Sequence, residues 1–437
     1  MKILLLGYCA IVLLGAALLT LPFASRGSEG TSFLDALFTS TSATCVTGLT
    51  RFDTFVHWSL FGQIIILILI QIGGIGYMTI VIVFVSFTKR KIGLASRFIL
   101  QDSIASPQVG GVVKMTKFIF AGSVIIEGVG TLLLALYFCP TMGLGEGLYF
   151  SLFHSVSSFC NAGFDLMGKF QPSSSLMLFA DNWYVCAVIM ALIVLGGLGF
   201  FVWYDLLMQK FRIRKCRLQT KFVIFVSVIL IFAGMFFILL FELKNPEMYD
   251  KPWDKKILSA LFQSVTTRTA GFYTIDISRL TQSTQAFMIM LMFIGGSTGS
   301  TAGGMKTTTA AVLILSIVAT FRRKKSIEAF GRRIEDGAIR TSCCIFVMYV
   351  VISFFTSMTL CNLEDVPFIS AFFECVSAIS TVGVSFGITP FVSPVSEVML
   401  ILLMLFGRVG SITMLLAFSS EKSAVPSKLP SEKIQVG

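Results

Sequence analysis

The sequence predicts an all-α polytopic membrane protein built from four tandem modules, each a membrane span, a semi-polar loop and a second span. Three observations support this fold class. Of the 437 residues, 55% are hydrophobic and only 13% are charged, whereas soluble domains carry roughly 25% charged residues. Apolar runs of spanning length occur eight times, and one loop pattern occurs four times between them. A chain this apolar cannot hide its surface from water, so the lipid bilayer is its solvent.

Eight apolar runs have lengths near the roughly 20 residues that cross a bilayer as a helix. They lie near 3–23, 59–87, 118–139, 183–203, 222–241, 285–320, 343–361 and 397–418. The first run follows Lys2 and could be read as a signal peptide. Its length and its place in the repeat favour a membrane span instead.

Pairing these spans divides the chain into modules and a tail. The modules cover 1–88, 89–209, 210–325 and 326–420, and the tail covers 421–437. Basic residues gather between the modules, in 88–117, 210–221 and 322–340. The positive-inside bias places these stretches and both termini in the cytoplasm. Membrane topology and contact with lipid headgroups therefore explain the net charge of +11, and no binding of nucleic acid is needed to account for it. The basic stretches are also compatible with docking of a cytosolic partner.

Several other classes of site are disfavoured by the residues present. The ten Cys are scattered and there are two His, so neither a disulfide framework nor a metal centre is indicated. No nucleophile–base set or HExxH motif is found, so we expect no enzyme. A phosphate-binding loop would need a Gly-Lys step, but Met305 separates Gly304 from Lys306.

The loop that repeats lies on the outer side, between the two spans of each module. Each copy runs from an aromatic anchor through a Ser/Thr-rich segment to one glycine, with offsets of 10, 10, 9 and 10 residues. The copies are LFTSTSATCVTGL (37–49), LFHSVSSFCNAGF (152–164), LFQSVTTRTAGF (261–272) and FFECVSAISTVGV (372–384). Glycines also recur in the spans that follow, at Gly73, Gly196, Gly295 and Gly407, where we expect close helix packing.

Elementary electrostatics predicts that these loops bind a cation. They are too short and polar to span, so they can enter the membrane only where protein or water faces their backbone. A short helix entering from outside points its partly negative carbonyl end at mid-membrane, which favours a cation. The glycine then permits backbone angles that let successive carbonyls face one axis. Four copies around one axis would replace the hydration shell of a cation, as a selectivity filter does.

The loops CVTG, CNAG, RTAG and STVG, together with GSTGSTAGGMKTTT in the sixth span, resemble the Ktr/Trk/HKT superfamily of potassium transporters over essentially the whole chain. Eight spans without an extra pair resemble the Ktr-type membrane subunit (KtrB). The resemblance implies pseudo-fourfold symmetry of the span–pore loop–span modules around a central pore. It also implies potassium uptake across a plasma membrane of the bacterial inner-membrane type, and it leaves sodium dependence open.

Carried over to this sequence, the resemblance implies that potassium lies among backbone carbonyls of the four loops. The implied residues are Val46, Thr47, Gly48, Asn161, Ala162, Gly163, Thr269, Ala270, Gly271, Thr381, Val382 and Gly383. Only the last three approach the TVGYG of potassium channels, and no copy has the second glycine. We therefore expect a shorter stack of oxygens and a less strict preference for potassium over sodium.

A Gly/Ser/Thr-rich segment at 295–306 interrupts the apolar run 285–320, and the resemblance implies a mobile loop below the filter that blocks the pore. Its residues are Gly295, Gly296, Ser297, Thr298, Gly299, Ser300, Thr301, Ala302, Gly303, Gly304 and Lys306. Arg408, near mid-membrane in the last span, should face protein or water, and we assign it to the same gate. A static packing break and a structural role for either cation are the alternatives.

Four more polar residues lie in or beside the spans and loops. Glu127 is a candidate partner for a buried cation, and Arg268 should point behind the filter, because a positive charge in the pathway would oppose conduction. Glu374 could brace its loop, and His154 has a packing role.

The resemblance further implies a homodimer seated on a cytosolic ring of nucleotide-binding subunits of the KtrA/TrkA type. ATP or ADP is expected only on that partner, and no covalent cofactor is expected on this chain. The main alternative is an alternating-access secondary transporter. Such proteins often use inverted repeats with midplane carboxylates, whereas these repeats run parallel and the candidate ion site holds no acid.

Overall fold

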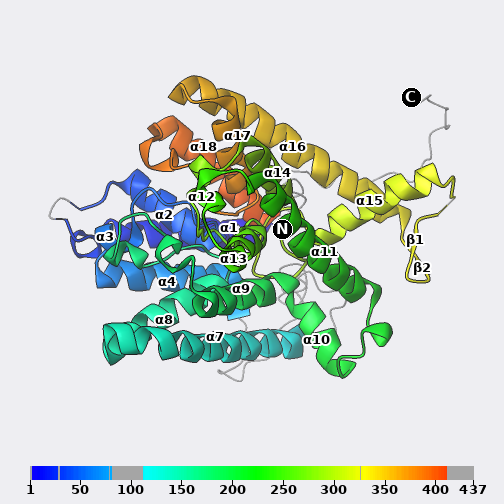
Figure 1. The fold of residues 1–437 in the computed structure, drawn as a ribbon, viewed down its shortest axis with the longest axis horizontal. Coiled ribbons are helices and arrows are strands. Elements are labelled where there is room, and N and C mark those ends of the chain that lie inside the picture. Colours follow the sequence, from blue (N-terminus) through cyan, green and yellow to red (C-terminus); the bar gives the residue numbers. More distant parts are fainter. Residues whose placement is uncertain (1, 28–29, 78, 81–111, 325, 411–437) are drawn as a thin grey trace.

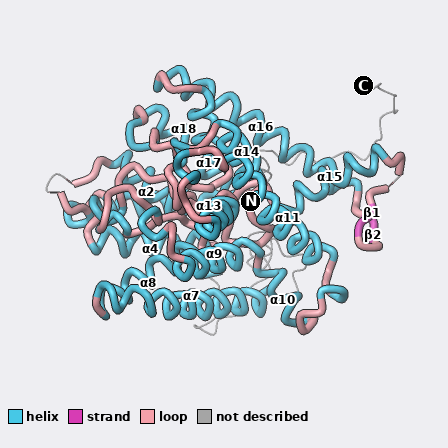
Figure 2. Tube along the Cα trace, viewed as in Figure 1, coloured by secondary structure: helices cyan, strands magenta, loops and turns pink. Residues whose placement is uncertain are grey.

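The computed structural model describes the chain except for residues 1, 28–29, 78, 81–111, 325 and 411–437 (Figure 1). Helices dominate the described residues, and the only strands among them form one small hairpin (Figure 2). The predicted tail at 421–437 and most of the basic stretch 88–117 lie outside the described residues.

The helices follow one order four times along the chain: a longer helix, a short helix that ends near the loop glycine, and a third helix. In the first half they are α1 (Lys2–Leu19), α2 (Phe33–Cys45), α3 (Thr54–His57), α4 (Leu60–Ile75), α7 (Val112–Met142), α8 (Leu144–Phe159), α9 (Trp183–Leu198) and α10 (Phe200–Met208). In the second half they are α11 (Leu218–Glu242), α12 (Pro246–Tyr249), α13 (Trp253–Thr266), α14 (Gln282–Phe293), α15 (Thr307–Phe321), α16 (Asp336–Glu364), α17 (Phe368–Ile379) and α18 (Pro394–Val409).

Short 3₁₀ turns follow several of these helices on the outer side and at the connections. They cover Pro22–Ala24, Met167–Lys169, Met177–Phe179, Ile213–Lys215, Ile277–Arg279 and Thr389–Phe391. The hairpin pairs β1 (Glu328–Ala329) with β2 (Arg332–Arg333) in antiparallel register beyond α15 (Figure 1), and Phe330 at its turn packs against Phe222 and Phe225 of α11.

Three helices among the described residues are long and apolar enough to cross a membrane: α7, α11 and α16. A fourth span results if α9 and α10, which meet at an 88° bend, are counted together. Helices overlap each of the other predicted runs but are shorter, and the run 285–320 is divided between α14 and α15. The chain is thus a multi-pass helical membrane protein, while eight spans in four modules remain a prediction.

The short helices α2, α8, α13 and α17 are held by their aromatic anchors. Phe38, Phe153, Phe262 and Phe373 are all fully buried, and burying a side chain of this size contributes roughly 1.5–3 kcal/mol. The first of these helices, α2, begins at Ser32, whose side chain accepts a hydrogen bond from the Asp35 amide, which satisfies one of the free N–H groups of the first turn.

Each short helix packs against the longer helix that precedes it: α2 on α1, α8 on α7, α13 on α11 and α17 on α16. The last helix, α18, also packs against α2. The C-terminal quarter of the described chain therefore adjoins the N-terminal quarter, and the arrangement closes on itself.

Candidate functional site

The four repeated loops share one backbone conformation. We number them loops 1 to 4, for residues 38–48, 153–163, 262–271 and 373–383. Two residues before each glycine the chain is left-handed, with φ of 56° at Val46, 59° at Asn161, 69° at Thr269 and 50° at Thr381. The glycines Gly48, Gly163, Gly271 and Gly383 have φ between 72° and 94°. Non-glycine residues rarely adopt positive φ, so its recurrence at matching positions shows that the loops are structural equivalents.

Backbone hydrogen bonds repeat as well. The residue before each glycine donates its amide to a carbonyl of the short helix: Thr47 to Ser42, Ala162 to Ser157 and Val382 to Ser377, each at 2.8 Å, and Ala270 to Thr266 at 2.9 Å. The bond spans five residues in loops 1, 2 and 4 but four in loop 3. The missing residue of loop 3 is therefore absorbed between Thr266 and Ala270.

The hydroxyl four residues after each aromatic anchor bonds to the loop, in two different ways. In loops 1 and 4 it accepts the glycine amide, from Gly48 to Ser42 at 3.1 Å and from Gly383 to Ser377 at 3.0 Å. In loops 2 and 3 it donates to the carbonyl after the glycine, at Phe164 and Phe272. This requirement explains why the repeat is rich in Ser and Thr at that position.

The four glycines form a closed ring. A Cβ atom placed on each one would meet the backbone of the next loop: Ala162 O at 2.5 Å from Gly48, Gly271 Cα at 2.7 Å from Gly163, Val382 O at 3.0 Å from Gly271, and Thr47 O at 2.0 Å from Gly383. Real Cβ atoms do not approach so closely, so only glycine lets the four backbones come together.

Polar groups without partners gather at this ring. Among the described residues, six buried hydroxyls there make no hydrogen bond: those of Thr44, Thr47, Ser158, Thr269, Ser380 and Thr381. A buried polar group without a partner costs about 1–3 kcal/mol. All six lie within the five residues that precede a ring glycine.

A pocket of about 120 Å³ is lined by all four ring glycines. Asp53 and Asp165 also line it. Asp53 caps α3, accepting the amides of Phe55 and Val56, both at 2.9 Å. Burial, and secondarily the charge of Asp53, raises the pKa of Asp165 to about 7. The pocket therefore presents acidic groups where a cation would enter.

The recurring glycines of the inner half serve close packing, as expected. A Cβ on Gly73, Gly196 or Gly407 would lie 2.0, 1.9 or 1.9 Å from a carbonyl oxygen near the end of a short helix, namely that of Thr44, Phe159 or Ile379. The three carbonyls occupy equivalent positions, four residues before their ring glycines.

The segment 295–306 lies against the ring from the other side. Its ends are joined by a hydrogen bond from the Gly295 amide to Met305 O at 2.8 Å. The Thr301 hydroxyl donates to Phe159 O of loop 2 at 3.1 Å. Cβ atoms on Gly303 and Gly295 would lie 1.9 Å from Thr381 Oγ1 and 3.2 Å from Thr269 Cγ2, in loops 4 and 3.

Both predicted gate cations bind this segment. Arg408 donates to Thr301 O and also to Gly73 O and Gly74 O at the end of α4. Lys306 donates to Ala302 O at 2.9 Å and Gly303 O at 3.3 Å, within its own segment. Arg408 therefore joins the segment to α4, whereas Lys306 only stabilises its turn.

Among the described residues, Glu127 pairs with an amide and not with a cation. Its carboxylate accepts from Gln71 Nε2, at 3.0 and 2.9 Å, and Cys160 Sγ lies 3.8 Å away. Arg268 is 8% exposed, its Nε has no partner among the described residues, and it does not line the pocket at the ring. That its charge is kept out of an ion pathway stays a prediction.

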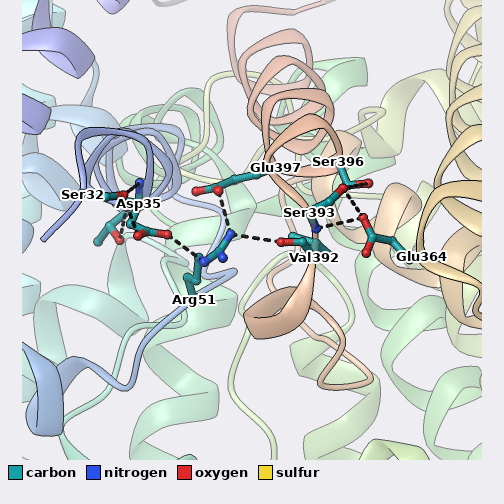
Figure 3. Close-up of polar contacts among 9 residues, drawn as sticks. Ser32, Asp35, Arg51, Glu364, Val392, Ser393, Ser396 and Glu397 are labelled. Carbon is teal, nitrogen blue, oxygen red and sulfur yellow. Dashed lines mark hydrogen bonds and ion pairs between the residues drawn. The ribbon is translucent and has the colours of Figure 1, made fainter.

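An ion-pair network joins the first and last quarters of the chain (Figure 3). It was not predicted from the sequence. Arg51 Nε lies 2.7 Å from Asp35, on α2, and its Nη1 lies 2.6 Å from Glu397, on α18. Arg51 also donates to Val392 O at 3.2 Å. Next to it, Ser393 binds Glu364 through its amide at 2.9 Å and its hydroxyl at 2.6 Å.

Comparisons with known proteins agree with this architecture. The profile of a family described as "TrkH: Cation transport protein" matches residues 9–426. The "Potassium/sodium uptake protein NtpJ" of Enterococcus hirae is 39% identical over 99% of this chain and 96% of its own length. The "Ktr system potassium uptake protein B" of Bacillus subtilis is 35% identical, covering 97% and 94%. The crystal structure of the potassium transporter TrkH from Vibrio parahaemolyticus superposes with a TM-score of 0.76 at 19% identity, covering 95% of this chain and 83% of that one.

Proposed function

The chain belongs to the TrkH family of cation transport proteins, and from this membership we propose that it is a potassium uptake pore with a filter of four loops. It is a transport protein and not an enzyme, as the sequence led us to expect. The observation that carries the filter assignment is the closed ring of Gly48, Gly163, Gly271 and Gly383.

The geometry of the ring supports cation binding in three ways. The residues before the glycines alternate between left-handed and ordinary backbone conformations, which turns successive carbonyls toward one side. The short helices point their partly negative ends at the ring. The buried hydroxyls without partners would bind a cation or its remaining water. Oxygen ligands of this kind suit potassium and sodium, and the name of the Enterococcus hirae relative includes both ions.

The segment 295–306 is proposed as the gate. It contacts loops 2, 3 and 4, and Arg408 of the last helix links it to α4, which follows loop 1. These contacts around the ring support a place for the segment below the filter. The guanidinium of Arg408 adds a positive charge that opposes the passage of a cation.

The filter is tested by measuring potassium, rubidium and sodium flux with purified protein in liposomes. Gly48→Ser and Gly383→Ser should lower the preference for potassium, because a Cβ would collide with Ala162 O or Thr47 O. Gly143→Ser is the matched control: Gly143 also has positive φ, at 86°, but a Cβ there meets nothing within 4 Å and the residue does not line the pocket at the ring. Unchanged selectivity in both ring variants would refute the assignment.

The gate is tested by shortening the segment 297–306. Flux without any cytosolic partner should rise, since the obstruction below the ring is removed. If flux falls to zero in protein that still elutes as a folded species, the segment is a structural part and not a gate.

We also propose the assembly that the relatives suggest. The Bacillus subtilis relative is named as part of a Ktr system, which supports a partner subunit. We propose that this partner is a cytosolic ring of the KtrA/TrkA type that binds ATP or ADP, and that the chain is a homodimer on it. Both termini then face the cytoplasm and the chain lies in the plasma membrane. Native mass spectrometry of the purified protein tests the dimer, and flux with added ring protein and nucleotide tests the regulation.

A further inference from the structure

One position of the repeat contacts the chain segment that leaves the ring in two of the four loops. It is the residue directly after the aromatic anchor: Thr39, His154, Gln263 and Glu374 in loops 1 to 4. The chemistry of this residue differs in every loop, although the surrounding backbone is the same.

In loop 4, Glu374 binds the exit segment through three donors. The side chain is fully buried, and none of the ion pairs among the described residues includes it. Its Oε1 accepts from the Ser385 hydroxyl and from the Phe386 amide, at 3.1 Å for the amide, and its Oε2 accepts from Thr389 Oγ1 at 3.1 Å. Three donors on the short stretch 385–389 fix the position of this segment relative to the short helix α17.

In loop 2, His154 makes the equivalent contact with a neutral ring. Its Nδ1 lies 2.7 Å from the Phe150 carbonyl, which can only accept, so Nδ1 carries the proton. Its Nε2 is then free to accept the Leu166 amide, at 3.3 Å. Leu166 and Phe386 both lie three residues after their ring glycines, so the same backbone amide is held in both loops.

Loops 1 and 3 lack this contact. The Thr39 hydroxyl donates to Asp35 O of its own helix at 3.0 Å. Neither side-chain polar atom of Gln263 has a partner among the described residues. Around the ring, loops 2 and 4 lie opposite each other, since each glycine contacts the loops before and after it.

We propose that Glu374 and His154 are positioning residues that fix the exit segments of two opposite loops and thereby set the ion preference of the ring. The proposal rests on the function proposed above. Discrimination between potassium and sodium depends on how many carbonyl dipoles surround the ion and how freely they move. Holding the chain three residues beyond Gly163 and Gly383 limits that movement, and releasing it lets the oxygens close around a smaller ion.

The experiment compares potassium and sodium flux in liposomes for a graded set of variants. Glu374→Ala removes all three acceptor contacts and should lower the potassium-to-sodium flux ratio by at least about fivefold, the lower end of typical coupling between sites. Glu374→Gln retains an oxygen for Phe386 and Ser385 and can donate to the Thr389 hydroxyl, so its ratio should stay near that of the wild type. The same logic applies to His154→Leu, which loses selectivity, and His154→Gln, which restores an acceptor for Leu166.

Gln263→Ala is the matched control, because the equivalent side chain of loop 3 has no contact to lose. If Glu374→Ala does not fold, Ser385→Ala and Thr389→Val remove the donors singly, and each should lower the ratio by a smaller amount. Equal losses in Glu374→Ala and Glu374→Gln would overturn the proposal, because the charge and not the position would then matter. An unchanged ratio in both Glu374→Ala and His154→Leu would overturn it as well. Gly383→Ser distinguishes failure of the positioning role from failure of the filter assignment. If Gly383→Ser alters selectivity while the Glu374 and His154 variants do not, the filter assignment is retained and the positioning role is wrong.

Discussion

Arg51 stabilises the protein where the last helix meets the first quarter of the chain. Replacing it with Met keeps much of the apolar side chain and removes the guanidinium. The change breaks the ion pairs with Asp35 and Glu397 and the hydrogen bond to Val392 O. It leaves Glu397 with no cation near its carboxylate, whose other oxygen already lacks a partner.

The exposed fractions of the three side chains determine the expected loss. They are 20% for Arg51, 17% for Asp35 and 2% for Glu397. Removing one partner of a fully buried pair costs about 3–5 kcal/mol, whereas exposed pairs contribute about 0–1 kcal/mol. Asp35 can regain water and Glu397 cannot, so we expect Arg51→Met to lower the free energy of unfolding by about 2–3 kcal/mol.

The assay is thermal or denaturant unfolding of purified protein in detergent, arranged as a double-mutant cycle with Glu397→Gln. The double variant should be more stable than the sum of the two single losses predicts, because the neutral amide that replaces the Glu397 carboxylate leaves no unpaired charge buried there. Lys255→Met is the control: Lys255 pairs with Asp181, and their side chains are 33% and 53% exposed, so its loss should stay below about 1 kcal/mol. Strict additivity of the two single losses would refute the reasoning.

The site itself leads to three further predictions. Arg408→Met removes the hydrogen bonds to Thr301 O and to the end of α4, so flux without a cytosolic partner should rise; an unchanged flux would contradict its role in the gate. Gly407→Ala places a Cβ 1.9 Å from Ile379 O and should cost about 1–3 kcal/mol in unfolding experiments, whereas the same change at Gly122, where a Cβ meets nothing within 4 Å, should be neutral or stabilising. The pKa of Asp165 is raised to about 7, so lowering the external pH through 7 protonates it and removes a negative charge from the pocket. Uptake at low potassium should then fall. Asp165→Asn should have low uptake at every pH and should not respond to pH in this range.

The conformation of the loops could be predicted because it depends on residues that are close together in the sequence. The spacing from aromatic anchor to glycine reflects one short helix and one left-handed turn, so equal spacing predicts equal backbone, and even the shorter third copy has a visible structural counterpart. The interruption at 295–306 was visible for the same reason, as a local change of composition inside an apolar run.

Contacts between distant segments left no such pattern. Arg51 and Glu397 are 346 residues apart and Gln71 and Glu127 are 56 apart, and no local spacing indicates which charged or amide side chains meet. For this reason the sequence did not indicate that Gln71 would bind Glu127, or that Arg408 would bind backbone carbonyls. His154 was predicted to have a packing role, and it is buried as expected, but its contact with Leu166 depends on how the exit segment folds back.

The glycine ring has a consequence for how this protein can change. In a ring of four identical subunits, every substitution is present four times, so the effect of a mildly harmful substitution is multiplied by four positions. Here the four glycines belong to one chain, so a substitution reaches one quarter of the ring and leaves the others intact. Selection can therefore adjust one quarter of the ring at a time. A third loop that is shorter than the other three is a difference that a ring of identical subunits could not have.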